Sequence, residues 1–411
     1  MKIIEGTLNR CLRIRSFRIL LANVYPILKK YKIIHLLKKL NMRNLIDPFD
    51  IVETDNKGIF RTYDMENFNV EEAIKKYTIN AENLIKLDRK YKFGFLPDPK
   101  DPHEEGYVKE ACKALGVEFI IFNINDPEVI KDIAKSGCDG VFINPAFSNN
   151  MIRSVYNEII QILSLETTIP IYPTIRELNL YESKRTVAYF LNINDIPHPR
   201  TSVFYDFKEA GRFLEKCQYP IVFKTNIGAS ASGVEILENR KQATKLARQI
   251  FHKYYLHKLQ LEKRAIEWGY MILQEYIKDA KEYRVIKVGD SWFSYQKWKE
   301  KHQVFLSGSG YAKMVDPSKN LLTFCYNIAD KFHFTTMCFD IFERENGEYL
   351  INELQTWFGS YDPSEMYVNN VPGRYRMIEG RWIFEPGFFN IYGSNLLRLT
   401  HFISLLQQKE S

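Results

Sequence analysis

Between Tyr91 and Pro173, short apolar runs alternate with longer segments in which apolar residues recur every three or four positions. Continuous apolar runs indicate buried strands, and the longer spacing indicates amphipathic helices. The pattern predicts strands at 91–97, 117–123, 140–144 and 169–173 and helices at 104–115, 127–136 and 150–165. Strands and helices that alternate in this way form parallel βαβ units in an open sheet. Such a sheet binds ligands outside the carboxyl ends of its strands.

After Pro199 the pattern changes to an α+β arrangement with antiparallel sheets. Strand 271–277 is expected to pair with strand 283–288, and strand 337–344 with strand 348–354. The predicted fold class is therefore α/β and α+β in one chain. The full set of elements predicted here comprises strands at 220–225, 234–237, 271–277, 283–288, 337–344 and 348–354 and helices at 208–216 and 240–257.

Asn346-Gly347 lies between the last two strands and is a strong signal for a two-residue type I′ turn. With these residues at the turn, Asp340 lies directly opposite Glu353, and Cys338 lies opposite Gln355. Opposed carboxylates repel each other unless a cation sits between them. Mg²⁺ is the favoured cation, because it takes a few carboxylate oxygens and keeps water and phosphate ligands. The alternative is an exposed sheet whose acids point into water.

A run of small residues at 225–233 follows the apolar strand 220–224. Glycine, alanine and serine let backbone N–H groups approach phosphate oxygens closely. Lys224, directly before the run, can reach the same phosphates as a point charge. The run lacks the Gly-Lys-Ser/Thr of a Walker loop, and on its own it is more typical of a plain turn.

Composition narrows the function classes. The chain has 411 residues, of which 45% are hydrophobic and 26% charged, so it forms two or three globular units and is not disordered over most of its length. The 6 cysteines include no C-x-x-C pair, which favours a reducing compartment over a zinc ribbon or a disulfide framework. The chain also lacks H-E-x-x-H and G-x-S-x-G.

The formal net charge of +7 is concentrated in residues 1–45, which carry eleven basic side chains and one acidic side chain. Apolar residues recur among them at helical spacing, which predicts two short amphipathic helices that break near Pro26. This basic face either docks on an anionic membrane surface or, as we favour, packs its apolar side against the protein. No stretch approaches the ~20 apolar residues of a membrane span. We expect a cytoplasmic protein, with peripheral contact to the inner membrane face as the alternative and no nucleic-acid partner.

The order of the candidate segments resembles the ATP-grasp superfamily of carboxylate–amine ligases, over roughly residues 91–359. The first segment is Tyr181-Glu182-Ser183-Lys184, followed by the Lys224 loop. The second is Leu273-Gln274-Glu275-Tyr276-Ile277 with Glu282-Tyr283-Arg284, which is similar to the ribosomal-protein glutamate ligases. The third is Asp340 with Glu353-Leu354-Gln355, where many members of the superfamily have Glu-x-Asn.

The resemblance implies an ATP-grasp fold, with residues 91–185 as a pre-ATP-grasp domain and residues 186–360 as two α+β lobes. Residues 1–90 would be a basic helical extension and residues 361–411 an aromatic C-terminal extension. ATP and Mg²⁺ are the implied cofactors, with Mn²⁺ as an alternative metal. The implied metal ligands are Asp340, Glu353 and Gln355, and the implied catalytic residues are Arg284 and Lys224. The implied nucleotide contacts are Lys184, Lys224, Gly228, Ser230, Ser232, Gly233, Val234, Gln274, Glu275, Tyr276, Ile277 and Glu282.

The resemblance also implies a reaction in which ATP phosphorylates a carboxylate and an amine then displaces phosphate to form an amide. The aromatic sequence after Gly359 is similar to ATP-grasp proteins of surface-polysaccharide assembly, which favours an amino acid joined to a uronic acid or sugar. Two alternatives stay open. One is a ligase that adds amino acids to peptides or proteins, and the other is an ATP-binding protein that acts as a switch or a kinase.

Overall fold

The computed structural model describes residues 70–99, 102–145, 150–228, 233–255, 266–298, 311–358 and 364–410. These residues fall in the second of two units of the chain, Thr62–Ser411. The basic segment 1–45, with the helices predicted in it, lies outside the described residues. Among the helices that the structure describes, none has the length and hydropathy needed to cross a membrane.

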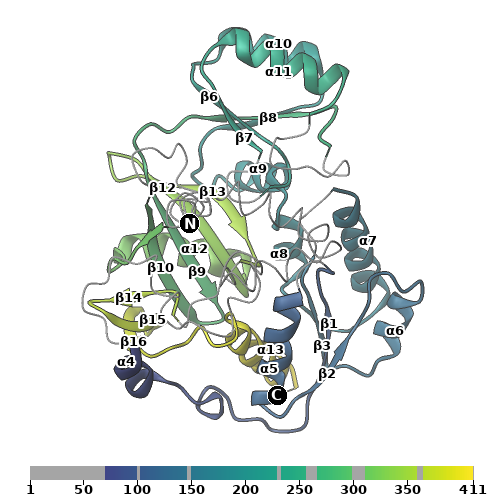
Figure 1. Ribbon diagram of the computed structural model, residues 1–411, viewed down its shortest axis with the longest axis vertical. Coiled ribbons are helices and arrows are strands. Elements are labelled where there is room, and N and C mark those ends of the chain that lie inside the picture. The colour runs from purple at the N-terminus through teal and green to yellow at the C-terminus, as the bar shows by residue number, and fades with distance from the viewer. Residues whose placement is uncertain are drawn as a thin grey trace, which may run out of the picture. The chain divides into compact units, whose positions relative to one another are not determined.

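A parallel sheet of four strands, in the order β2-β1-β3-β4, forms the first layer (Figure 1). Strand β3 is buried along its whole length, because helices cover parallel sheets on both faces. The predicted alternation of strands and helices is confirmed. After α4 (Val70–Tyr77) and the 3-10 helix η3 (Ala81–Asn83), the elements are β1 (Lys92–Leu96), α5 (Pro102–Ala114), β2 (Glu118–Ile121), α6 (Val129–Lys135), β3 (Gly140–Ile143), α7 (Asn150–Glu166) and β4 (Ile171–Tyr172).

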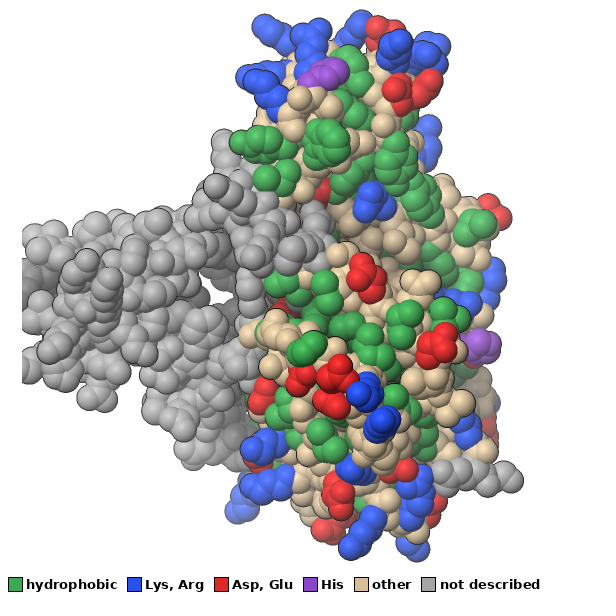
Figure 2. Space-filling model, turned by 90° about the vertical axis from the view of Figure 1, so that its right-hand side faces the viewer, with side chains coloured by type: hydrophobic (Ala, Val, Ile, Leu, Met, Phe, Trp, Pro, Cys, Tyr) green, Lys and Arg blue, Asp and Glu red, His purple; other side chains and the backbone are tan. Residues whose placement is uncertain are grey.

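An antiparallel sheet in the order β5-β8-β6-β7 follows, and α10 and α11 lie along one of its faces (Figure 1). Both helices are amphipathic: Ala243 and Ile250 of α11 are buried, and the exposed positions are charged or polar, with many lysines and arginines in this part of the surface (Figure 2). The elements are α8 (Ile175–Leu180), α9 (Lys184–Ile193), β5 (Thr201–Phe204), α10 (Phe207–Lys216), β6 (Ile221–Lys224), β7 (Val234–Leu237), α11 (Arg240–His252) and β8 (Met271–Glu275).

Helix α11 ends before the predicted position at 257. Its backbone leaves the helical region at Lys253, and Tyr255 then forms an isolated antiparallel bridge with Glu267. The bridge turns the chain toward β8.

An eight-stranded antiparallel sheet follows, with the order β13-β12-β9-β10-β15-β14 along its main path and with β11 and β16 paired to β10 and β15. The expected pairing of 271–277 with 283–288 is wrong, because β8 belongs to the four-stranded sheet and β9 to this one. The elements are β9 (Lys281–Val288), β10 (Ser291–Trp298), β11 (Tyr311–Lys313), α12 (Lys319–Phe332), β12 (Thr336–Glu343), β13 (Tyr349–Gln355), β14 (Tyr367–Val368), β15 (Val371–Ile378), β16 (Arg381–Pro386) and α13 (Asn395–Glu410).

The two neighbouring strands β8 and β9 separate because their apolar residues pack into different cores. Met271 and Leu273 of β8 pack with α10 and α11, whereas Val285 and Ile286 of β9 pack with α12. Sequence proximity favours a hairpin, but burial in two separate cores overrides it. The connector 276–280 therefore links the two sheets.

Glu177 joins the region of the parallel sheet to the start of β12. Its side chain is fully buried, and Oε1 accepts the backbone N–H groups of Thr335 and Thr336, both at 2.7 Å. Oε2 accepts the hydroxyl of Thr335 at 2.7 Å and the backbone N–H of Thr174 at 2.8 Å, which closes a capping box on α8. One carboxylate thus fixes the first residue of the strand that carries Asp340.

We predict that Glu177→Ala lowers the free energy of unfolding by about 3 kcal/mol or more, because it leaves several buried donors without an acceptor. A thermal melt followed by circular dichroism would show a melting temperature several degrees below that of the unaltered protein. Glu158→Ala, at an exposed position on α7, is the matched control and should leave the melt unchanged. Equal melting temperatures for the two variants would contradict this role of Glu177.

Candidate active site

The pairing of β12 with β13 brings the two predicted carboxylates together. Asp340 lies opposite Glu353, and Cys338 lies opposite Gln355, as the sequence predicted. On its other edge β12 pairs with β9, which places Arg284 opposite Asp340. Three of the predicted site residues thus lie side by side on adjacent strands.

The turn of this hairpin differs from the prediction. Gly347 donates its N–H to the carbonyl of Arg344, and Arg344 donates to the carbonyl of Glu348, each at 2.9 Å. The loop therefore has three residues and ends on Gly347 with a φ of 83°, as in a type I turn followed by a left-handed glycine. The predicted two-residue type I′ turn is wrong, and the longer loop shifts the pairing of the adjoining residues by one position.

A β-bulge at Asn352 restores the predicted register. The pairing moves from Ile341 with Ile351 to Asp340 with Glu353, so Asn352 is left without a partner on β12. A bulge redirects the side chain it carries, and here the amide oxygen of Asn352 accepts a hydrogen bond from Lys224 Nζ at 2.7 Å. The sequence analysis missed Asn352, because a strict alternation of faces has no signal for an extra residue.

Asp340 is held by two cations. Arg284 donates from Nε to Oδ1 at 2.8 Å and from Nη2 to Oδ2 at 2.9 Å, a bidentate pair. Lys297 Nζ lies 2.7 Å from Oδ2 and also contacts the buried Glu282. Burial alone would raise the pKa of Asp340, but Arg284 and Lys297 hold it well below its usual range. Asp340 therefore stays ionised, and Lys297 is a second residue that the sequence analysis missed.

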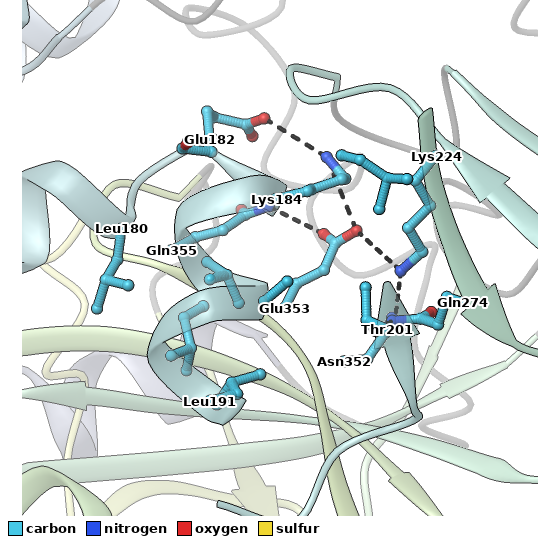
Figure 3. Close-up of a pocket in the computed structure, with 15 residues that line it drawn as sticks. Leu180, Glu182, Lys184, Leu191, Thr201, Lys224, Gln274, Asn352, Glu353 and Gln355 are labelled. Atoms are coloured by element: carbon cyan, nitrogen blue, oxygen red, sulfur yellow. Dashed lines mark hydrogen bonds and ion pairs between the residues drawn. The ribbon is translucent and has the colours of Figure 1, made fainter. Parts of the chain in front are cut away.

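The other two lysines of the site lie close to the carboxylate of Glu353 (Figure 3). Lys184 Nζ lies 3.9 Å and Lys224 Nζ 3.8 Å from Glu353 Oε1, one from α9 and the other from β6. Gln355 donates from Nε2 to Oε2 at 3.2 Å. Together with Gln274 these residues line one cavity, so the structure brings together predicted residues from the three segments of the sequence.

Burial lowers the pKa of Lys224 to about 8, although the nearby Glu353 carboxylate partly offsets the effect. The side chain of Lys224 is 7% exposed. An ammonium group with so little contact to water and no charged partner at hydrogen-bonding distance gives up its proton more easily than a free lysine.

Glu182 is a third site residue that the sequence analysis did not single out. Its backbone has a φ of 46°, which is rare for a residue other than glycine and is found at functional sites. Oε2 accepts the N–H of Gly228 at 3.3 Å and lies 4.0 Å from Lys184 Nζ, and Lys184 donates to the carbonyl of Gly228 at 2.7 Å. Burial raises the pKa of Glu182. The first residue of the predicted phosphate loop is thus tied to Lys184 and Glu182.

The far end of the predicted phosphate loop requires a glycine. Gly233 has a φ of 81°, and a Cβ on it would lie 1.9 Å from the hydroxyl of Thr225. Thr225 donates its N–H to the carbonyl of Gly233 at 2.8 Å, and Val234 then pairs with Lys224. Ser230 and Ser232 lie outside the described residues, so their predicted phosphate contacts stay predictions.

The predicted adenine-binding segment lies where the two sheets meet. Gln274 and Glu275 end β8, and Tyr276 and Ile277 begin the connector to β9. Gln274 donates to the hydroxyl of Thr201 at 3.0 Å. The carboxylate of Glu275 accepts the N–H of Arg200 at 3.2 Å and a guanidinium hydrogen of Arg344 at 3.0 Å. Glu275 therefore fastens the end of β8 to the hairpin loop.

The predicted metal ligands Asp340, Glu353 and Gln355 lie on the paired strands β12 and β13, and their metal role stays a prediction. Glu353 Oε1 has no hydrogen bond from Lys184 or Lys224, because both ammonium groups lie beyond 3.5 Å, at 3.9 Å and 3.8 Å. Asp340 retains lone-pair capacity beside its three cationic contacts. Gln355 would contribute its carbonyl oxygen after its amide turns over. The described residues contain no group of three His, Cys, Asp or Glu that could hold a metal, so phosphate and water oxygens would complete the shell.

The chain is similar to known proteins in structure but not detectably in sequence. No protein-family model matches the chain, and no curated protein matches its sequence. D-cycloserine synthetase DcsG superposes with a TM-score of 0.52 at 12% identity, over 76% of this chain and 99% of that one. The ADP complex of PurK, N5-carboxyaminoimidazole ribonucleotide synthetase, gives a TM-score of 0.49 at 15% identity, over 67% of this chain and 72% of that one. The sheet topology and the superposition on DcsG show that the chain has the ATP-grasp fold.

Proposed function

We propose that this chain is an ATP-dependent ligase that activates a carboxylate as an acyl phosphate and joins it to an amine. The observation that supports the proposal most is the convergence of Lys184 and Lys224 on Glu353, one strand away from the clamp of Arg284 on Asp340. Ammonium groups beside a carboxylate offer charge for phosphate oxygens and, next to them, oxygens for a divalent cation.

In this proposal the triphosphate replaces contacts that the two lysines now make with neutral oxygens. Lys184 now donates to the carbonyl of Gly228, and Lys224 donates to the amide oxygen of Asn352, each at 2.7 Å. Both lysines would give up these acceptors for phosphate oxygens, which form stronger charge-assisted hydrogen bonds. The backbone of the loop that ends at Gly233 would lie over the phosphates. The base would lie against Tyr276 and the rest of the connector 276–280.

The cavity has to widen to admit a nucleotide. It encloses about 20 Å³, room for about one ordered water molecule, whereas small-molecule sites run ~300–1,000 Å³. Its walls come from α9, from the four-stranded sheet and from β13 of the eight-stranded sheet. We infer that the two lobes separate when a nucleotide enters and close again around it.

In this reaction the protein would chiefly position the substrates and neutralise charge. Mg²⁺, when bound, supplies neutralisation of the phosphate oxygens. Arg284, whose orientation Asp340 fixes, and Lys224 stabilise the charge that spreads over the phosphoryl group during transfer. A closed cavity keeps water away from the acyl phosphate, which water would otherwise hydrolyse.

Trp382, in the aromatic sequence after Gly359, and Trp357, just before it, both make internal contacts. Trp357 donates from Nε1 to the carbonyl of Ile143 at 2.7 Å, and Trp382 donates to the hydroxyl of Thr323 at 3.0 Å. Trp357 is buried, and Trp382 is half-buried with its ring against Trp292 and Tyr326, so both serve packing. The uronic-acid and peptide acceptors therefore rest on the sequence alone. The two acceptor classes can be separated by measuring ADP release while amino acids are combined with uronic acids or with peptides.

We predict that Glu353→Gln lowers amine- and carboxylate-dependent ADP release about 100-fold or more, because the metal and both lysines lose a charged partner. Glu348→Gln, at an exposed position of the same hairpin, is the matched control and should keep full activity. Release of ADP by Glu353→Gln at the unaltered rate would overturn the assignment. ATP binding by the unaltered protein without any substrate-dependent ADP release would favour the switch alternative.

The pKa of Lys224, about 8, gives nucleotide binding a pH signature. Only the ammonium form attracts phosphate, so affinity for ADP should fall as the pH rises above 8, by up to about tenfold per pH unit. Calorimetry in buffers of different ionisation enthalpy should show that binding above this pH takes up a proton. Lys224→Met should abolish both effects, and Lys281→Met, an exposed control on β9, should keep them. An affinity of the unaltered protein that stays constant from neutral to alkaline pH would contradict the prediction.

A further inference from the structure

Arg398 of the C-terminal helix α13 is fully buried and fixed on one side only. Its Nη1 lies 3.3 Å from Glu104 Oε1 and 3.0 Å from Asn395 Oδ1. The guanidinium carbon lies 4.3 Å from the ring centre of Trp357 and 4.8 Å from that of Phe358, so two aromatic rings hold its plane. These rings directly follow the strand that carries Glu353.

The remaining edge of this guanidinium makes no hydrogen bond. Both Nε and Nη2 of Arg398 are buried without a partner. This is the edge with which Arg284 grips Asp340, from Nε at 2.8 Å and from Nη2 at 2.9 Å. A side-on guanidinium edge matches the two oxygens of a carboxylate. A buried donor without an acceptor costs free energy of folding. Two such donors on one edge of a guanidinium therefore indicate that an anion binds there.

Arg153 of α7 is a second buried arginine with two nitrogens that make no hydrogen bond, although these two do not form a side-on edge. Its side chain is 4% exposed, Nη2 donates to the carbonyl of Leu178, and Nε and Nη1 have no partner. Burial lowers the pKa of Arg153 to about 10. Arg153 forms no ion pair with the carboxylates that the structure describes, and Glu182 acts on its charge only from a greater distance, which is rare for a buried arginine.

Both arginines border the carboxyl edge of the parallel sheet. Trp357, on which Arg398 stacks, donates to the carbonyl of Ile143, the last residue of β3, at 2.7 Å. The guanidinium carbon of Arg153 lies 5.5 Å from the ring centre of Tyr181, and Tyr181 packs in the same hydrophobic core as Trp357. The next residue is Glu182, which contacts Lys184 and Gly228. Ligands of open α/β sheets bind at this edge.

We propose that Arg398 and Arg153 bind the carboxylate-bearing substrate, with the free edge of Arg398 as the bidentate anchor and Arg153 as the second cation. This proposal rests on the proposed ligase function and names the class of substrate that its site selects. It also gives the C-terminal helix a role in substrate selection: α13 supplies the anchor, and Trp357 and Phe358 orient it next to the hairpin.

The test uses the full chain and malonate as the carboxylate probe, with MgADP already bound, and measures affinity by calorimetry. Arg398→Lys keeps the charge but removes the bidentate edge, and we expect it to weaken malonate binding about tenfold or more while the affinity for ADP changes little. Arg153→Lys, on a separate helix, should weaken malonate in the same direction. Arg376→Lys, an arginine paired with Asp290 and Glu385 on β15, is the matched control.

Each outcome decides the proposal. Malonate affinity that is unchanged in both lysine variants, even with a lowered melting temperature, would show that the arginines only support the fold. No malonate binding to the unaltered protein, or tight binding of inorganic phosphate in its place, would also overturn it. Failure of ADP itself to bind would instead count against the proposed function, so the two failures are distinguishable.

Discussion

Two carboxylates that face each other on adjacent strands set the main constraint on this structure. Like charges in that position repel, and charges removed from water need partners. The chain supplies a separate pair of cations to each carboxylate. Because these cations come from four different elements, the hairpin ties the four-stranded sheet to the eight-stranded sheet. Arg284 of β9 and Lys297 of β10 serve Asp340, and Lys184 of α9 and Lys224 of β6 serve Glu353.

The charges around Asp340 and Glu353 balance before any ligand binds. Glu182 beside Lys184 and Glu282 beside Lys297 raise the number of acids to that of the bases. A balanced cluster is cheaper to bury than an unpaired charge, but it carries no surplus to attract a polyphosphate. A nucleotide would therefore need to bring its own counter-ion, which agrees with the lone-pair capacity left on Glu353 and Asp340.

The sequence predicted the features that depend on local periodicity. The parallel βαβ layer follows from apolar spacing alone, and the facing of Asp340 and Glu353 follows from placing the turn at Asn346-Gly347. That register is correct only because two deviations cancel: the loop is one residue longer than predicted, and Asn352 bulges out of β13. Features set by tertiary packing could not be predicted, such as the separation of β8 from β9. Lys297 and Asn352 act through partners distant in sequence, and Glu182 contacts the distant Gly228 as well as the nearby Lys184, so no local spacing marks their roles.

The places where local rules fail are connected in space. Opposed carboxylates on β12 and β13, a positive φ at Glu182 and the unpartnered edge of Arg398 each cost stability. A fold keeps such features where binding needs them and compensates elsewhere. These features lie along a path from the β12–β13 hairpin, past Lys184, to the carboxyl edge of the parallel sheet. An arginine held by two rings and one carboxylate cannot collapse onto a nearer partner, and the substrate therefore meets its charge in a fixed position.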